Sequence, residues 1–219
     1  MGLIVSVLGS TGLFAALSDT ARTGQNQIDS APLAGSAELK IQPATYTPPS
    51  PLGGGESISC PLTGWVDDLT TGGFTATSVQ PGFDSGNTYY CIQNAGSQTV
   101  HLLGNTDSVI DVENGCTGDE ALLGDTSCGG ALIEDGELSD VIQVRWAPVS
   151  CVTVVSGGET TIQIDGNETA PVDLGLIAPG EIRCFGLGAF YPTVTPVDEV
   201  QRAQSDRIQW RFKFTGQVS

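Results

Sequence analysis

Six cysteines are the residues of this 219-residue chain whose chemistry is easiest to interpret. The chain has no Cys-x-x-Cys pair, and its single histidine, His101, cannot complete a Cys/His zinc site of the usual spacing. Because the count is even, the sequence favours disulfides over metal, and disulfides imply an oxidising compartment. Cys116 and Cys128 enclose a short loop, so we expect them to pair. The simplest completion joins Cys60 to Cys91 and Cys151 to Cys184, although the spacing alone leaves this connectivity open.

Carboxylates are the second group of chemical interest. The segment from Asn105 to Asp140 contains ten acidic residues and no basic ones, and we interpret it as an acidic insertion. Carboxylate oxygens suit calcium, but the segment lacks the spacing of an EF-hand loop. The favoured interpretation is a solvated acidic loop, with a calcium site as the alternative. The candidate calcium ligands are Asp107, Asp111, Glu113, Asp119, Glu120 and Asp125.

The charge of the whole chain excludes some partners. There are 25 acidic and 8 basic residues, which give a formal net charge of −17, and no lysine or arginine occurs between Lys40 and Arg145. Such a surface repels phosphate backbones and anionic lipid headgroups. We therefore expect no binding to nucleic acid and no binding to anionic membrane surfaces.

Catalytic signatures are not apparent in the sequence. We find no HExxH, GxSxG, SxxK or P-loop pattern. His101 lies in the alternating run TVHLL, where we interpret it as a strand residue rather than a general base. Asn167 begins an Asn-Glu-Thr acceptor pattern for N-glycosylation, which is a weak signal. We expect a protein that is not an enzyme and has no cofactor apart from the calcium alternative.

Apolar and polar residues alternate in several short runs, which is typical of half-buried strands. Residues 37–42 alternate in this way, and Ile142, Val144 and Trp146 share one face of a second run. The clearest strand comes last, where Ile208, Trp210, Phe212 and Phe214 alternate with Arg207, Gln209, Arg211 and Lys213.

Turn signals organise these runs. Residues 89–93 and 99–103 flank the turn sequence NAGS and are predicted to form a hairpin. Residues 43–57 are rich in proline and glycine and are predicted to be a surface connection. With 29 glycines, 12 prolines and about eight short strands, the chain is predicted to be all-β, as a two-sheet sandwich spanning residues 37–219.

The N-terminus is organised differently. Residues 3–16 form an apolar run of about the length of a signal-peptide core, and too short for a comfortable membrane span. We therefore interpret residues 1–15 as a signal-peptide-like segment. This predicts secretion, without stable membrane insertion after the signal is cleaved.

Three segments carry a resemblance to a known family. The sequence GLFAALSDTARTGQNQIDSAPLAGSAELKIQ resembles the start of the TasA and camelysin proteins, which are secreted fibre subunits of biofilms with a dedicated signal peptidase. YYCIQNAGSQTVHL, residues 89–102, resembles a strand and turn of that family, and AQSDRIQWRFKFTG, residues 203–216, resembles its closing strand. The acidic insertion is closer to relatives from high-GC bacteria than to TasA itself.

This resemblance implies a jelly-roll-like sandwich and cleavage between Ala15 and Ala16. It also implies a filament subunit, of a pilus or a biofilm-matrix fibre. Residues 16–36 would then form an N-terminal arm that fills a gap in the sheet of a neighbouring copy, by donor-strand complementation. The arm residues expected to act in assembly are Ala16, Leu17, Ser18, Asp19, Thr20, Ala21, Ile28 and Leu33.

The resemblance thus makes a homopolymer at the cell surface or outside the cell the favoured expectation. The alternative is a monomeric secreted or surface sandwich that binds cations, glycans or another protein. A third interpretation is a metallopeptidase, because camelysin relatives are often labelled as such, but the chain shows no recognisable zinc triad.

Overall fold

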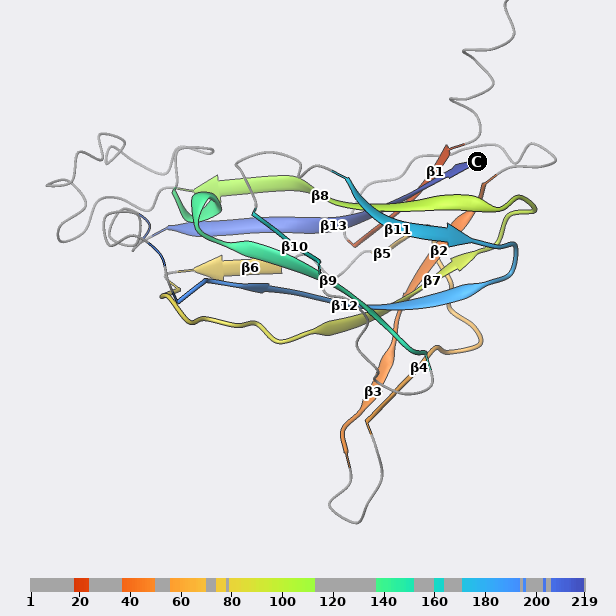
Figure 1. The fold of residues 1–219 in the computed structure, drawn as a ribbon, viewed down its shortest axis with the longest axis horizontal. Coiled ribbons are helices and arrows are strands. Elements are labelled where there is room, and N and C mark those ends of the chain that lie inside the picture. Colours follow the sequence, from red (N-terminus) through yellow and green to blue (C-terminus); the bar gives the residue numbers. More distant parts are fainter. Residues whose placement is uncertain are drawn as a thin grey trace, which may run out of the picture.

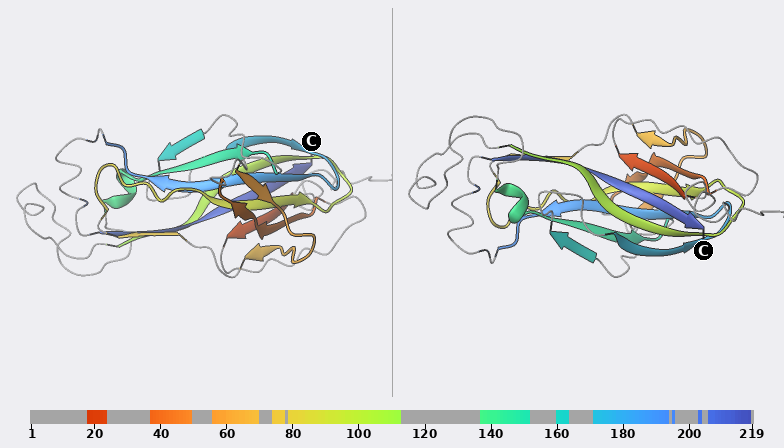
Figure 2. Two further views of the ribbon diagram at one scale, coloured as in Figure 1. Left: turned by 90° about the horizontal axis from the view of Figure 1, so that it is seen from below. Right: turned by 90° about the horizontal axis from the view of Figure 1, so that it is seen from above.

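The described residues of the computed structural model form an all-β sandwich of two sheets (Figure 1). The structure describes residues 18–23, 37–49, 56–69, 74–77, 79–112, 137–151, 160–163, 171–193, 195, 203 and 206–218. The two layers are seen edge-on in Figure 2. The all-β sandwich predicted from the alternating runs is confirmed.

The first sheet has six strands. Its order is β11 (Val172–Ile177), β8 (Val100–Val112), β13 (Arg207–Val218), β1 (Ser18–Thr23) and β5 (Asp68–Leu69), and β6 (Phe74–Thr77) also pairs with β13. All neighbours are antiparallel except β1 and β5, which are parallel. The long strand β13 is therefore the centre of this sheet.

The second sheet has five antiparallel strands. Its order is β10 (Thr160–Gln163), β9 (Gln143–Val149), β12 (Ile182–Phe190), β7 (Thr88–Asn94) and β2 (Leu39–Pro43). One short 3-10 helix, η2 (Leu138–Asp140), precedes β9, and both Leu138 and Ser139 are buried.

The core between the sheets is aromatic at its centre. Phe212 and Phe214 of β13 are fully buried, and the ring of Trp146 from β9 meets both of them edge to face, with centroids 4.7 and 5.4 Å apart. The predicted burial of alternate residues in β13 is confirmed, because Ile208 and Trp210 are also at most 2% exposed. Gly104 of β8 allows this close packing, since a Cβ there would lie 2.8 Å from the Trp146 ring.

The predicted hairpin between residues 89–93 and 99–103 is wrong. Strand β7 pairs with β12 and β2 in one sheet, whereas β8 pairs with β13 and β11 in the other. The NAGS sequence does make a reversal, but it crosses between the layers. The buried Asn94 side chain stabilises this crossing by donating to the carbonyl oxygens of Gln98 and Ile177.

The segment predicted as a surface connection, residues 43–57, contains strand pairing that its proline content did not predict. Strands β3 (Thr45–Thr47) and β4 (Ser57–Ser59) form a separate two-stranded ribbon that projects from the sandwich (Figure 1). Tyr46 of this ribbon stacks on Tyr89 of β7, with ring centroids 5.1 Å apart. The prolines at positions 48 and 49 follow β3, so they interrupt no pairing.

Both ends of the segment predicted as an acidic insertion, residues 105–140, lie within the described sandwich. Residues 105–112 belong to β8 and pair with β13, with Lys213 opposite Asn105 and Ile208 opposite Asp111. At the other end, residues 137–140 lie in and beside η2, where Leu138 and Ser139 are buried and Leu138 belongs to the core. Residues 113–136 lie outside the described residues.

Candidate assembly site

The N-terminal strand β1 lies between β13 and β5 in the first sheet. It pairs antiparallel with β13 over five residues, from Ser18 opposite Gln217 to Arg22 opposite Lys213. Its other edge meets β5 in parallel, with Thr23 opposite Leu69. Strand β1 is therefore held by two strands that lie far from it along the chain. Thirteen residues, 24–36, separate β1 from the next described segment.

The edge of β13 that receives β1 is shared with a second short strand. Residues 207–210 of β13 pair with β6, and residues 213–217 pair with β1. The opposite edge of β13 is covered by β8 along nearly its whole length. Without β1, the backbone of residues 213–217 would be an unpaired edge, which is a template for pairing with another chain.

This part of β13 is backed by the core. Phe214, which lies opposite Ala21, is fully buried and packs against the ring of Phe185 at 5.5 Å. Gly216 lies opposite Asp19, and a Cβ at Gly216 would lie 3.2 Å from the Leu39 side chain of β2. The position of β1 is thus a slot, which we define as the β13 edge at residues 213–217 together with β5.

The expected arm residues fall partly within this slot. Ser18, Asp19, Thr20 and Ala21 lie in β1. Ala16, Leu17, Ile28 and Leu33 lie outside the described residues, as does the signal-peptide-like segment 1–15. The sequence did not predict β5, which borders the slot, or β6, which pairs with the same edge of β13. Each of these short strands contains one large apolar residue, Leu69 or Phe74, which is too weak a pattern to predict a strand.

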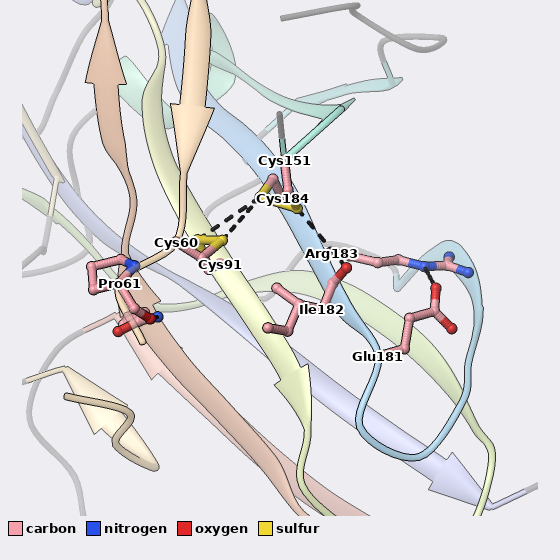
Figure 3. The surroundings of a disulfide bond; sticks show 9 residues. Cys60, Pro61, Cys91, Cys151, Glu181, Ile182, Arg183 and Cys184 are labelled. Carbon is pink, nitrogen blue, oxygen red and sulfur yellow. Dashed lines mark hydrogen bonds and ion pairs between the residues drawn. A yellow bond between two sulfur atoms is a disulfide. The ribbon is translucent and has the colours of Figure 1, made fainter. Parts of the chain in front are cut away.

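Two disulfides join peripheral segments to the central strands β7 and β12 of the second sheet (Figure 3). The Cys60–Cys91 bond ties the end of the β3/β4 ribbon to β7, and the Cys151–Cys184 bond ties the end of β9 to β12. Both pairings match the simplest completion suggested by the sequence. The third expected pair, Cys116 with Cys128, lies outside the described residues.

Two of the candidate calcium ligands, Asp107 and Asp111, lie among the described residues, and both are buried in strand β8. Asp107 lies in β8, is 4% exposed and forms an ion pair with Arg211 at 3.2 Å. Asp111 also lies in β8, is 3% exposed and accepts a hydrogen bond from the Ser139 backbone N–H at 2.7 Å. These carboxylates are held within the sheet rather than displayed on a loop. Glu113, Asp119, Glu120 and Asp125 lie outside the described residues, and so does the glycosylation candidate Asn167.

Burial changes the acidity of Asp111. Desolvation raises the pKa of this carboxyl to about 6, although the Ser139 N–H hydrogen bond acts in the opposite direction. Its second oxygen, Oδ1, is buried with no hydrogen-bond partner among the described residues. Asp111 is therefore a titratable group within the core and not part of an open cation site.

His101 is a strand residue, as the sequence indicated. It lies in β8, and its Nε2 is 2.6 Å from Oδ1 of Asp173 in the neighbouring strand β11. Asp173 also accepts from the Gly175 N–H, and these contacts lower the pKa of the Asp173 carboxyl. The pair is partly exposed and links two adjacent strands.

Membrane-spanning helices and similarity to known proteins were both searched for in this chain. Among the described residues there is no helix long and apolar enough to cross a membrane. In comparisons with known proteins, the chain matches no family model, no curated protein and no solved structure. The described part of the chain defines an all-β, disulfide-linked, two-sheet sandwich.

Proposed function

We propose that this chain is a structural subunit of an extracellular filament, in which the N-terminal strand of one copy fills the slot of the next. The observation that carries the proposal is the register of β1, which pairs with β13 over residues 213–217 and with β5 on its other side. A short terminal strand inserted between two strands is the arrangement that donor-strand exchange requires.

The exchange has a simple physical basis. An arm donated by a neighbour makes the same backbone hydrogen bonds with β13 as the chain's own arm, so the exchange changes few contacts. The 13 residues between Thr23 and Ala37 span at most about 45 Å when fully extended. That reach is enough for the arm either to fold back on its own sandwich or to enter an adjacent one.

The proposed class is consistent with the other features of the chain. The sequence resemblance to the TasA and camelysin proteins supports a jelly-roll arrangement, cleavage before Ala16 and a role in a pilus or biofilm-matrix fibre. Two disulfides and the apolar N-terminal run support secretion to the cell surface or the medium. On this proposal the partner is a second copy of the chain, and no enzymatic activity is assigned.

One observation favours a second candidate function. In the structure β1 fills the slot of its own chain, which is what a monomeric secreted or surface-displayed sandwich would do. Such a monomer would act by binding a cation, a glycan or another protein. The two candidates differ in whether the arm leaves its own slot.

Deletion of residues 16–29 from the chain that begins at Ala16 tests the proposal. The chain with its arm should form uniform thin filaments by negative-stain electron microscopy, and the truncated chain should remain a folded, disulfide-bonded monomer. Adding a peptide of residues 16–29 to the intact chain should shorten or block the filaments. A matched control is Leu62→Ser, because Leu62 is 96% exposed and lies outside β1, β5 and β13, and this variant should assemble normally. Filaments formed by the truncated chain would rule the proposal out.

A further inference from the structure

The two disulfides lie against each other and form one cluster of sulfur atoms. The Sγ atom of Cys184 is 3.2 Å from that of Cys60 and 3.8 Å from that of Cys91. Cys91 and Cys184 are also direct partners in the register of β7 and β12. Figure 3 shows the two bonds side by side, with Cys151 at the outer end.

The topology of the sheet produces this cluster from four separate segments. Cys91 and Cys184 come from adjacent central strands and are almost fully buried. Cys60 follows β4, and Cys151 follows β9, so each reaches the strand pair from an opposite side. The Cα atoms are 6.0 Å apart in the first disulfide and 5.3 Å apart in the second. All four side chains therefore start from a small region of backbone.

This spacing is close to that of a tetrathiolate metal site. Zinc bound by four cysteines has Zn–S bonds of about 2.3 Å in a tetrahedron, which places neighbouring sulfurs about 3.8 Å apart. The two contacts between the disulfides, at 3.2 and 3.8 Å, already approach this separation. Among the described residues, Cys60, Cys91 and Cys184 form the one group of three potential ligands whose atoms lie within 4.8 Å of one another. Cys151 lies outside this group and is connected to it through its bond with Cys184.

We propose that Cys60, Cys91, Cys151 and Cys184 form a binding site for one zinc-class divalent ion when the chain is reduced, and two disulfides when it is oxidised. Soft thiolate ligands in a tetrahedral arrangement select zinc over hard cations such as calcium or magnesium. The segments that follow β4 and β9 would thus be crosslinked to β7 and β12 either by disulfides or by a shared metal ion. Which one forms depends on the redox state.

The chemistry balances with a thiol or phosphine as the reductant. Reduction of the two disulfides takes up four electrons and four protons and yields four thiols. Binding of one divalent ion then releases four protons and leaves a complex with a charge of −2. Oxidation of that complex by one molecule of oxygen reforms both disulfides and releases the ion, and the four electrons and four protons taken up by the oxygen give two molecules of water.

An open pocket gives access to the cluster at the Cys151–Cys184 bond. This pocket is lined in part by Pro148, Leu174 and Ile182. The opposite end of the cluster is closed by the buried residue Ile58 of the β3/β4 ribbon. An ion or reductant would therefore enter beside Cys151, which is half-buried, rather than beside Cys91.

The test uses the chain with Cys116→Ser and Cys128→Ser, so that only the four clustered thiols remain. The protein is reduced with a phosphine, freed of reductant by gel filtration without oxygen, and titrated with Co²⁺ as a spectroscopic probe and then with Zn²⁺. We expect one equivalent of Co²⁺ per chain, with the visible absorption of a tetrahedral tetrathiolate, and its displacement by Zn²⁺. Tryptophan fluorescence should stay native-like in the metal complex, because Trp146 remains in the packed core.

Matched variants distinguish a specific four-cysteine metal site from nonspecific binding of metal to free thiols. Cys91→Ser and Cys151→Ser should each remove the tetrathiolate absorption and weaken Co²⁺ binding at least tenfold. The oxidised chain should bind no Co²⁺ with thiolate absorption. The proposal is overturned if the reduced chain shows no tetrathiolate spectrum, if the serine variants bind equally well, or if binding occurs only in a chain with unfolded fluorescence. Conversion to a Cys60–Cys184 disulfide without metal uptake would also overturn it.

Discussion

Asp107 of β8 and Arg211 of β13 form an ion pair across the first sheet, with Oδ1 and Nε 3.2 Å apart. The two side chains are only 6% and 13% exposed. The guanidinium of Arg211 also contacts the Ser108 hydroxyl beside Asp107. A carboxylate that the sequence suggested for calcium is therefore neutralised within the protein by an arginine from the last strand.

Replacing Asp107 by alanine should be strongly destabilising. The substitution leaves the Arg211 charge poorly solvated without its partner, and loss of one member of a buried pair typically costs about 3–5 kcal/mol. Urea unfolding of the oxidised chain measures this change. Asp67→Ala is the matched control, because Asp67 is 63% exposed in its ion pair with Lys40 and should change stability by less than about 1 kcal/mol. Equal effects of the two substitutions would contradict the assigned burial.

Replacing Trp210 by alanine tests the predicted core face of β13. Trp210 is 2% exposed and stacks on Phe74 of β6 with ring centroids 5.6 Å apart. By analogy with other large core truncations, we expect a loss of about 3–5 kcal/mol in the free energy of unfolding. Trp65→Ala should cost clearly less, since Trp65 is only half-buried beside the disulfides. A Trp210→Ala loss below that of Trp65→Ala would show that β13 is placed wrongly.

The raised pKa of Asp111 predicts a specific pH dependence. Its pKa is about 6 in the folded chain and about 3.9 when unfolded, so the folded state binds more protons between these values. The contribution of Asp111 to stability therefore falls as the pH rises from 4 to 6, by about 3 kcal/mol in total. Because an asparagine side chain does not titrate, the Asp111→Asn variant should gain stability relative to the parent over this range.

Asp84 provides a control of opposite sign for that experiment. The Arg145 guanidinium lowers the pKa of the Asp84 carboxyl, so ionised Asp84 stabilises the fold at higher pH and loses this effect as the pH falls. Asp84→Asn should therefore lose stability relative to the parent as the pH rises through the acidic range. Thermal unfolding curves measured from pH 2 to pH 7 separate the two variants, because the Asp84 effect lies below the ordinary pKa of 3.8 and the Asp111 effect lies between pH 4 and pH 6. Parallel pH profiles for Asp111→Asn and the parent would contradict the burial of Asp111.

The sequence predicted the strands better than it predicted their partners. Alternation identified β13 because Phe212 and Phe214 are large and regularly spaced, and this property is local. The turn after Asn94 was equally clear, but nothing local shows whether a reversal stays in one sheet or crosses to the other. The pairing of β1 with β13 joins segments nearly 200 residues apart, and such pairing depends on the whole fold.

The acidic segment illustrates a second limit. Ten acidic residues within 36 suggested a loop, but three of the four residues from Val109 to Val112 are β-branched and apolar, and they continue β8. The neutralising partner of Asp107 lies more than 100 residues away at Arg211, so composition within the segment could not reveal it. The disulfides were easier to anticipate, because pairing nearest neighbours along the chain left few combinations.

Disulfide trapping of the arm tests the central claim most directly. Thr20 and Thr215 are direct partners in the β1/β13 register, and cross-strand partners have Cα separations within the range of a disulfide. In the double variant Thr20→Cys/Thr215→Cys, donor-strand exchange predicts a ladder of covalent oligomers on a non-reducing gel of assembled material. In Thr20→Cys/Gln209→Cys the ladder should be absent, because Gln209 pairs with Thr75 of β6. A crosslink found only within single chains of the assembled protein would contradict exchange of the arm between copies.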